Sequence, residues 1–120
     1  MAITTSVITN SFKKELLEGT HNFKASGGNS FKLSLYTSSA TLGKSTTSFT
    51  TDNQVSNTGQ YTSGGGALTN GGTSLSTNTA IIDFADRSFT GVTLTARGAL
   101  IYNDTASGDP AVAVLDFGGD

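Results

Sequence analysis

Cysteine is absent from this 120-residue chain, and other residues suited to catalysis are few. The lack of cysteine excludes disulfides, thiolate metal sites and cysteine nucleophiles, although it fixes no redox compartment. His21 is the only histidine, and no Gly-x-Ser-x-Gly sequence is present to support a serine-histidine-aspartate triad. We therefore predict no catalytic residues, no cofactor-binding residues and no metal ligands, and interpret the chain as a structural or binding protein, not an enzyme.

Charge is also scarce, since only 13% of the residues are charged and the formal net charge is −2. The densest basic feature, Lys13 and Lys14, is offset by Glu15 and Glu18, so nucleic-acid and membrane-surface binding are not expected. No apolar run approaches the ~18 residues of a membrane span. The N-terminal residues lack the basic and apolar regions of a secretory signal. These features predict a soluble protein that is synthesised in a cytoplasm.

Two short patterns resemble known sites without meeting their requirements. Residues 42–45 imitate the end of a phosphate-binding loop, but the first glycine of that motif is missing. Asp83 and Asp86 form one pair of carboxylates, and Asp104 and Asp109 form another. Neither pair has the spacing of a calcium-binding loop. His21 itself is expected to be a partly exposed residue at the end of a helix.

Arg97 is one of two arginines and lies in an apolar stretch just before Gly98. Its stem can cover apolar surface while the guanidinium reaches water. Alternatively, it can pair with a carboxylate of a neighbouring subunit. The sequence leaves both interpretations open.

The abundant residues are uncharged and polar. Serine and threonine make up about three residues in ten, glycine contributes 15 residues and proline only one. Threonine suits half-exposed strands, whereas serine and glycine suit turns. This composition, with the pattern described below, predicts one domain over residues 1–120. Its fold class is all-β, an antiparallel sandwich or jelly-roll-like domain with one short N-terminal helix.

The helix is predicted over residues 10–19, with Asn10 or Ser11 as its N-cap and Gly19 as its end. Phe12 and Leu16 lie on one stripe, so the helix should dock on another element. It either plugs one end of the β-structure or serves as an interface helix.

Strands are predicted wherever apolar and polar residues alternate or an apolar run is bounded by turns. A buried central strand is expected at 111–115, after a hairpin loop at 103–110, and Gly98 should mark a bulge or bend. The other predicted strands span 31–36, 80–85, 89–97 and 99–102. Eight residues are predicted to face the core: Leu33, Leu35, Ile82, Phe84, Leu94, Leu100, Val112 and Val114.

The segment at about 43–79 is rich in glycine, serine and threonine and poor in apolar residues. A structureless loop of this length is unusual in a compact domain. Short strands therefore interrupt it, near residues 60–62 for instance, or it is an arm that a partner orders. Its sparse apolar anchors are Phe49, Val55, Tyr61, Leu68 and Leu75.

Four blocks of sequence carry a family resemblance: SFKKELLEG at 11–19, FKLSLYTSSATLG at 31–43, TARGALIYN at 95–103 and AVAVLDFGGD at 111–120. In this order they resemble a group of small structural proteins of tailed bacteriophage virions. The group carries no catalytic motif, so the resemblance assigns no residue roles. Related sequences continue past the final Gly-Gly-Asp into another strand, so either this relative is short, or a final edge strand is missing or supplied by a neighbour.

The resemblance implies a virion structural protein, and we favour a capsid decoration (cement) protein on the head surface. Its partners would then be the major capsid protein and copies of itself, with a homotrimer favoured because the shell offers threefold sites. Two alternatives remain. One is a tail-fibre or tail-tip module that binds host glycans through Tyr36, Tyr61 and Tyr102. The other is a head–tail connector or tail-tube subunit.

Overall fold

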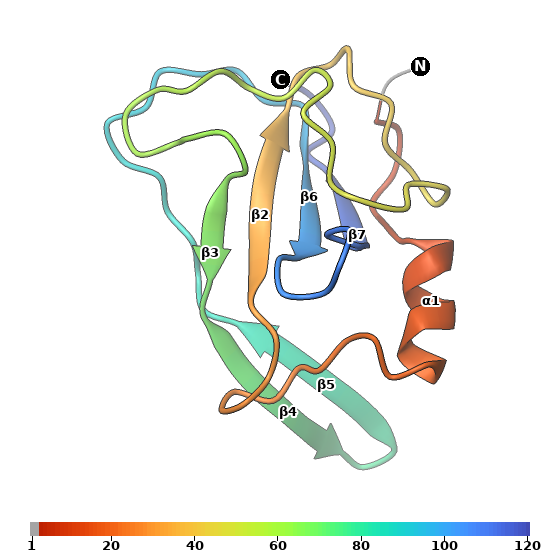
Figure 1. The fold of residues 1–120 in the computed structure, drawn as a ribbon. Coiled ribbons are helices and arrows are strands. Elements are labelled where there is room, and N and C mark those ends of the chain that lie inside the picture. Colours follow the sequence, from red (N-terminus) through yellow and green to blue (C-terminus); the bar gives the residue numbers. More distant parts are fainter. Residues whose placement is uncertain (1–2) are drawn as a thin grey trace.

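The computed structural model describes residues 3–120, which form two antiparallel sheets and one short helix (Figure 1). The larger sheet has the strand order β1-β7-β6-β2-β3, and the smaller sheet is a hairpin of β4 and β5. The prediction of an all-β fold with one short N-terminal helix is confirmed. The elements are β1 (Val7–Ile8), α1 (Asn10–Leu17), β2 (Phe31–Tyr36), β3 (Gly66–Leu68), β4 (Asn70–Ser76), β5 (Thr79–Phe84), β6 (Gly98–Asn103) and β7 (Ala111–Asp116).

Helix α1 packs against β7 at one side of the large sheet (Figure 1). Its N-cap is Thr9, whose hydroxyl accepts a hydrogen bond from the Phe12 amide at 3.3 Å, so the prediction of Asn10 or Ser11 as the cap is wrong. The reason is that the Thr9 amide still bonds to the Val112 carbonyl, which extends the pairing of β1 by one residue. Gly19 follows the C-cap with a φ of 75°, as the prediction of a helix end there requires. Within residues 3–120 no helix has the length and apolarity that crossing a bilayer requires.

The three central strands β7, β6 and β2 are covered on both faces. Adjacent residues of a strand point to opposite faces, and Ala99 and Leu100 of β6 lie in two different apolar clusters, each fully buried. The predicted strand at 31–36 is confirmed with the same bounds. The buried strand at 111–115 and the loop before it are confirmed as well, since β7 lies between β1 and β6.

The predicted core residues divide into three groups. Leu35, Leu100, Val112 and Val114 are buried, as predicted. Leu33, Phe84 and Leu94 are partly buried and pack against the apolar clusters. Ile82 is 42% exposed, so its assignment to the core is wrong. It belongs to β5, which is a strand as predicted but pairs only with β4 and not with the large sheet.

The prediction of a strand at 89–97 is wrong, because this stretch is irregular. Its alternation still has a structural basis, since Val92, Leu94 and Ala96 pack against the cluster around Leu35. Only its last amide, that of Arg97, donates to a strand, at the Tyr36 carbonyl of β2, whereas the amides of Thr90 and Thr93 donate to side chains of an irregular segment. The Thr93 amide donates to the Thr58 hydroxyl at 3.0 Å, for example. Apolar alternation therefore reports which side chains face inward, not which backbone groups pair.

Gly98 is the first residue of β6 and not the site of a bulge. The irregularity in the pairing of β6 with β7 lies between Ile101 and Tyr102. A Cβ atom at Gly98 would collide with the carbonyl oxygen of Leu115 and would lie 2.7 Å from a methyl of Ile3. Glycine is required there because the backbones approach closely.

The polar segment at 43–79 is only in part a projecting arm. Up to β3 it runs along the body, where Val55 and Tyr61 are buried and β3 pairs with β2. The strand expected near residues 60–62 is a single bridge between Thr58 and Tyr61. Strands therefore do interrupt the segment, at β3 and β4, and the part that leaves the body begins at Asn70.

Candidate functional site

The β4–β5 hairpin, which we call the arm, projects from one end of the large sheet (Figure 1). Nearly all of its residues are exposed on both faces. Among them are three large apolar side chains, Leu75 at 75% exposure and Ile81 and Ile82 at about half that value. The arm carries no charged residue from Asn70 to Ile82. Exposed aliphatic groups on a stretch without charge are typical of a surface that another protein covers.

The base of the arm is fixed to the body. The Ala85 amide donates to the Thr69 carbonyl at 2.9 Å, and the Phe84 ring packs 5.7 Å from the ring of Phe31. A bulge between Asn70 and Thr73 interrupts the pairing of β4 with β5. Bulges bend strands and redirect them, so this bulge lies where the ribbon leaves the body.

The tip of the arm is strained. Ser76 pairs with Thr79, which leaves Thr77 and Asn78 as a two-residue loop. Thr77 has a φ of 55°, in the left-handed region that β-branched residues rarely adopt. Backbone strain of this kind is concentrated at functional segments. The tip is therefore a second feature, besides the exposed apolar groups, that marks the arm as a candidate site.

A cleft of about 700 Å³ lies between the N-terminal segment and the loop that follows β2. We call it the threonine cleft. Val7 and Leu42 supply apolar surface to it, and Lys44 is its one charged lining residue. Its volume is within the range of ligand-binding clefts. Six threonines line it: Thr4, Thr5, Thr41, Thr46, Thr47 and Thr50.

The tyrosines predicted as glycan contacts are all buried in the body: Tyr36, Tyr61 and Tyr102. Their hydroxyl groups serve the fold. Tyr36 donates to the Thr50 carbonyl at 2.6 Å, and Tyr102 donates to the carbonyl of Gly64. Burial raises the pKa of each tyrosine above its ordinary value. These bonds hold the polar segment of residues 50–64 against the sheet.

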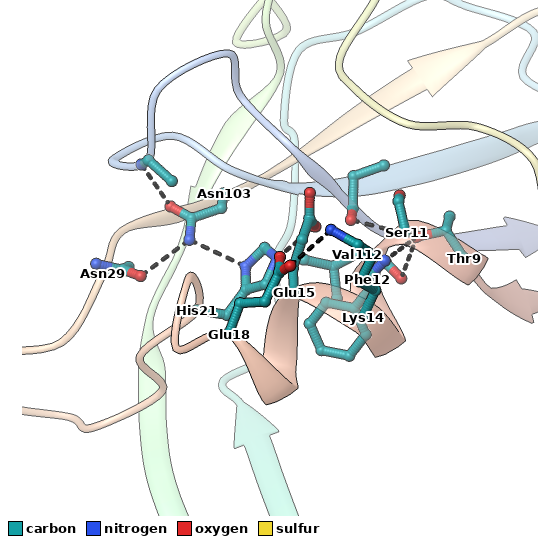
Figure 2. Close-up of polar contacts among 12 residues, drawn as sticks. Thr9, Ser11, Phe12, Lys14, Glu15, Glu18, His21, Asn29, Asn103 and Val112 are labelled. Carbon is teal, nitrogen blue, oxygen red and sulfur yellow. Dashed lines mark hydrogen bonds and ion pairs between the residues drawn. The ribbon is translucent and has the colours of Figure 1, made fainter.

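His21 is buried, so the prediction of a partly exposed residue is wrong. Its Nε2 atom lies 2.9 Å from Oε1 of Glu15, and its Nδ1 atom lies 3.1 Å from Nδ2 of Asn103 (Figure 2). The Phe12 ring lies 4.8 Å from the imidazole. The chain thus places its only histidine between the helix, an aromatic cluster and the β6–β7 hairpin.

The partners of Asn103 determine the tautomer of His21. Asn103 Oδ1 accepts from the amides of Thr105 and Ala106, so its nitrogen must point to His21 and to Asn29 Oδ1. An amide nitrogen only donates, and His21 Nδ1 must therefore accept. The imidazole then carries its proton on Nε2 and donates it to Glu15. With both nitrogens engaged inside the fold, this histidine has a structural role.

Arg97 forms an ion pair within its own chain, an arrangement that the sequence interpretations did not include. Its Nε atom lies 3.1 Å from Oδ1 of Asp116 in the same chain. The Gly118 amide and Arg97 both donate hydrogen bonds to that carboxylate and lower its pKa. Arg97 therefore joins the start of β6 to the end of β7.

The aspartate pairs do not converge on a site. Asp104 lies 3.4 Å from the ammonium of Lys32, whereas Asp83 and Asp86 are exposed and form no ion pair within residues 3–120. In that part of the chain no three acidic or histidine side chains gather closely enough to hold a metal ion.

The sequence indicated an arm only within residues 43–79, and it gave no sign of the Asn103 network. The arm has a weak signal, because Thr77-Asn78 is not one of the dipeptides that announce a tight hairpin. Asn103 was expected only as the start of a turn. Known proteins offer no guide to either feature, since no family model, no curated protein and no solved structure matches the chain.

Proposed function

We propose that this chain is a bacteriophage virion structural protein that decorates the capsid. The observation that supports the proposal best is the arm, a ribbon without charge from Asn70 to Ile82 on which Leu75, Ile81 and Ile82 are exposed. A protein with such an arm is suited to lie across a boundary between subunits. The sequence resemblance to tailed-phage virion proteins supplies the assembly in which such boundaries occur.

The body of the protein fits this role because it is held together internally. Buried tyrosine hydroxyls fix the polar segment to the sheet, as Tyr36 does at Thr50, and the body therefore keeps its shape when many copies dock. A decoration protein binds many equivalent sites, so weak individual contacts add up by avidity. The partners in this proposal are the major capsid protein and further copies of this chain, arranged as a homotrimer.

The chemistry of the arm predicts how binding should respond to salt. Surface ion pairs weaken as ionic strength rises, whereas apolar contacts do not. The arm has no charge between Asn70 and Ile82. Decoration through the arm should therefore persist in high salt, and binding that vanishes there would indicate a charged interface instead.

The glycan-binding alternative is weaker than the decoration hypothesis. It depended on exposed tyrosines beside a polar groove, and Tyr36, Tyr61 and Tyr102 are buried. The threonine cleft has no aromatic lining residue on which a sugar ring could stack. A connector or tail-tube role differs from decoration in the number of copies of the protein per virion.

The deciding experiment measures the amount of this protein in purified virions of its phage by quantitative mass spectrometry. The major capsid protein is the internal reference. Decoration predicts a copy number of the same order as that reference and loss of the protein from tail-only particles. A copy number far below the reference, or recovery with tails, would contradict decoration and favour the connector or fibre alternative.

A further inference from the structure

The arm is incomplete as an isolated element. Within residues 3–120 its two strands pair only with each other, so both outer edges of the ribbon are open. A lone two-stranded ribbon is at best marginally stable in water. Leu75 near its tip is 75% exposed, and Ile81 is 40% exposed. The arm therefore needs a receiving surface that accepts aliphatic and hydroxyl groups together.

Every copy of this chain carries such a surface, the threonine cleft. Its apolar contributors are Val7 and Leu42, and threonine hydroxyls surround them. The distal arm has the matching composition, with Leu75, Ile81 and Ile82 set among serine, threonine and asparagine. We infer that the threonine cleft receives the β4–β5 arm of a second copy of this chain.

The arm cannot reach the cleft of its own chain. Figure 1 shows the arm below the large sheet, whereas the N-terminal segment and the loop after β2 lie beside the upper part of that sheet. The base of the arm is held by the bond from Ala85 to Thr69 and by the packing of Phe84 on Phe31. The contact must therefore join different copies.

Charge complementarity favours a second copy as the occupant. Lys44 at the cleft is exposed and forms no ion pair among the described residues. Asp83, at the root of the arm, is also exposed and forms no ion pair within residues 3–120. Seating the arm of one copy in the cleft of the next brings an unpaired carboxylate toward an unpaired ammonium.

The geometry of this contact is heterologous, because the arm of one copy meets a different surface on its neighbour. Contacts of this type close into rings when the rotation allows and otherwise form open chains. The homotrimer of the proposed function is one such ring, and two copies that exchange arms reciprocally would form a smaller closed assembly, a twofold dimer. The inference rests on the self-association part of that proposal and does not require the shell.

The test is the oligomeric state of the purified full chain, measured by light scattering coupled to size-exclusion chromatography over a range of concentrations. We expect a closed oligomer for the unaltered chain. Ile81→Asp in the arm and Thr47→Arg in the cleft should each raise the dissociation constant at least about tenfold. Leu17→Asp is the matched control, because Leu17 is 92% exposed on α1, outside both arm and cleft, and this variant should assemble normally.

Charge exchange identifies the receiving surface. Lys44→Glu and Asp83→Lys should each weaken assembly, and the chain carrying both changes should recover it. Circular dichroism on each variant separates loss of folding from loss of assembly, since all these positions are at the surface. The inference would be overturned if the unaltered chain is monomeric. It would also be overturned if Ile81→Asp weakens assembly while Thr47→Arg does not, or if the chain with both charge changes fails to assemble. A monomer that still decorates virions would leave the proposed function standing while this inference fails.

Discussion

Asn103 donates a hydrogen bond from Nδ2 to Nδ1 of His21 across 3.1 Å, and both side chains are buried (Figure 2). The two residues are far apart in sequence, and their contact joins the turn after α1 to the end of β6. The Oδ1 atom of Asn103 accepts hydrogen bonds from the amides of Thr105 and Ala106. One amide side chain thus orders both the hairpin loop and the histidine.

Replacing Asn103 by alanine should destabilise the fold without changing its surface. The change leaves one buried imidazole acceptor and two partly buried backbone donors without their partner, and each buried unsatisfied group costs about 1–3 kcal/mol. We expect a loss of about 2–4 kcal/mol in the free energy of unfolding in urea, because water that enters the site recovers part of the cost. Lys24→Ala, at an exposed position, is the control and should change stability little. A loss below about 0.5 kcal/mol for Asn103→Ala would show that the network contributes no net stability.

Because its tyrosines are buried, the folded chain should ionise them and unfold only above their ordinary pKa. Burial raises the pKa of all three, so the folded state favours their protonated forms. Their contribution to stability is complete below the ordinary tyrosine pKa of about 10 and is lost as pH rises through the folded values. Absorbance at 295 nm should therefore stay low past pH ~10 and rise together with unfolding, whereas the chain in urea should titrate near pH 10. Phenolate that forms in a still-folded chain would contradict the burial of Tyr36, Tyr61 and Tyr102.

Asp116 should make stability depend on pH in the opposite direction, with a loss at acid pH. Hydrogen bonds from the Gly118 amide and from Arg97 lower its pKa in the folded state. Its contribution is present above the ordinary carboxyl pKa of about 4 and disappears as pH falls through the folded value. Asp116→Asn should thus lower the melting temperature at pH 7 and have less effect near pH 2. Asp52→Asn, at an exposed aspartate without an ion pair in residues 3–120, is the control, and a difference for Asp116→Asn that persists undiminished at pH 2 would exclude an ionic cause.

Leu35 and Ile82 test the division between body and arm. Leu35 is 9% exposed in the large sheet, whereas Ile82 is 42% exposed in the arm. Leu35→Ala should cost about 2–5 kcal/mol in urea unfolding, because it leaves a cavity. Ile82→Ala should cost the isolated chain no more than about 1 kcal/mol, because much of that side chain is already in water. Equal losses would mean that the arm packs against the body.

The sequence indicated the central strands because their apolar residues are continuous or alternate without interruption. Residues 31–36 and 111–115 were found with nearly their observed bounds for this reason. Alternation misled at residues 89–97, where side chains point inward while the backbone bonds to Thr58 and Gln60. It misled at Ile82 as well, because β-propensity does not say which sheet a strand joins.

The candidate site was less predictable than the fold. The sequence predicts an arm within residues 43–79, but most of that segment lies on the body, held by contacts that no local pattern encodes. The Val55 amide, for instance, donates to the Leu35 carbonyl at 2.9 Å. His21 was misplaced for a similar reason, since Asn103 and Phe12, which enclose it, come from distant parts of the chain.

Hydrogen exchange on the free and the assembled protein tests the arm directly. Within residues 47–61 the amides of Phe49, Val55 and Gln60 bond to other parts of the body, and they should be protected equally in both states. The amides of β4 and β5 should exchange fast in the free chain, because an isolated ribbon opens readily. Assembly should slow them, most of all around Leu75 and Ile81, where burial is expected. Thr77→Gly serves as an internal check, because it relieves the left-handed strain at the tip and should slow exchange in the free arm without altering residues 47–61. Strong and equal protection of the arm in both states would mean that the ribbon is stable alone, and assembly would then have to use another surface.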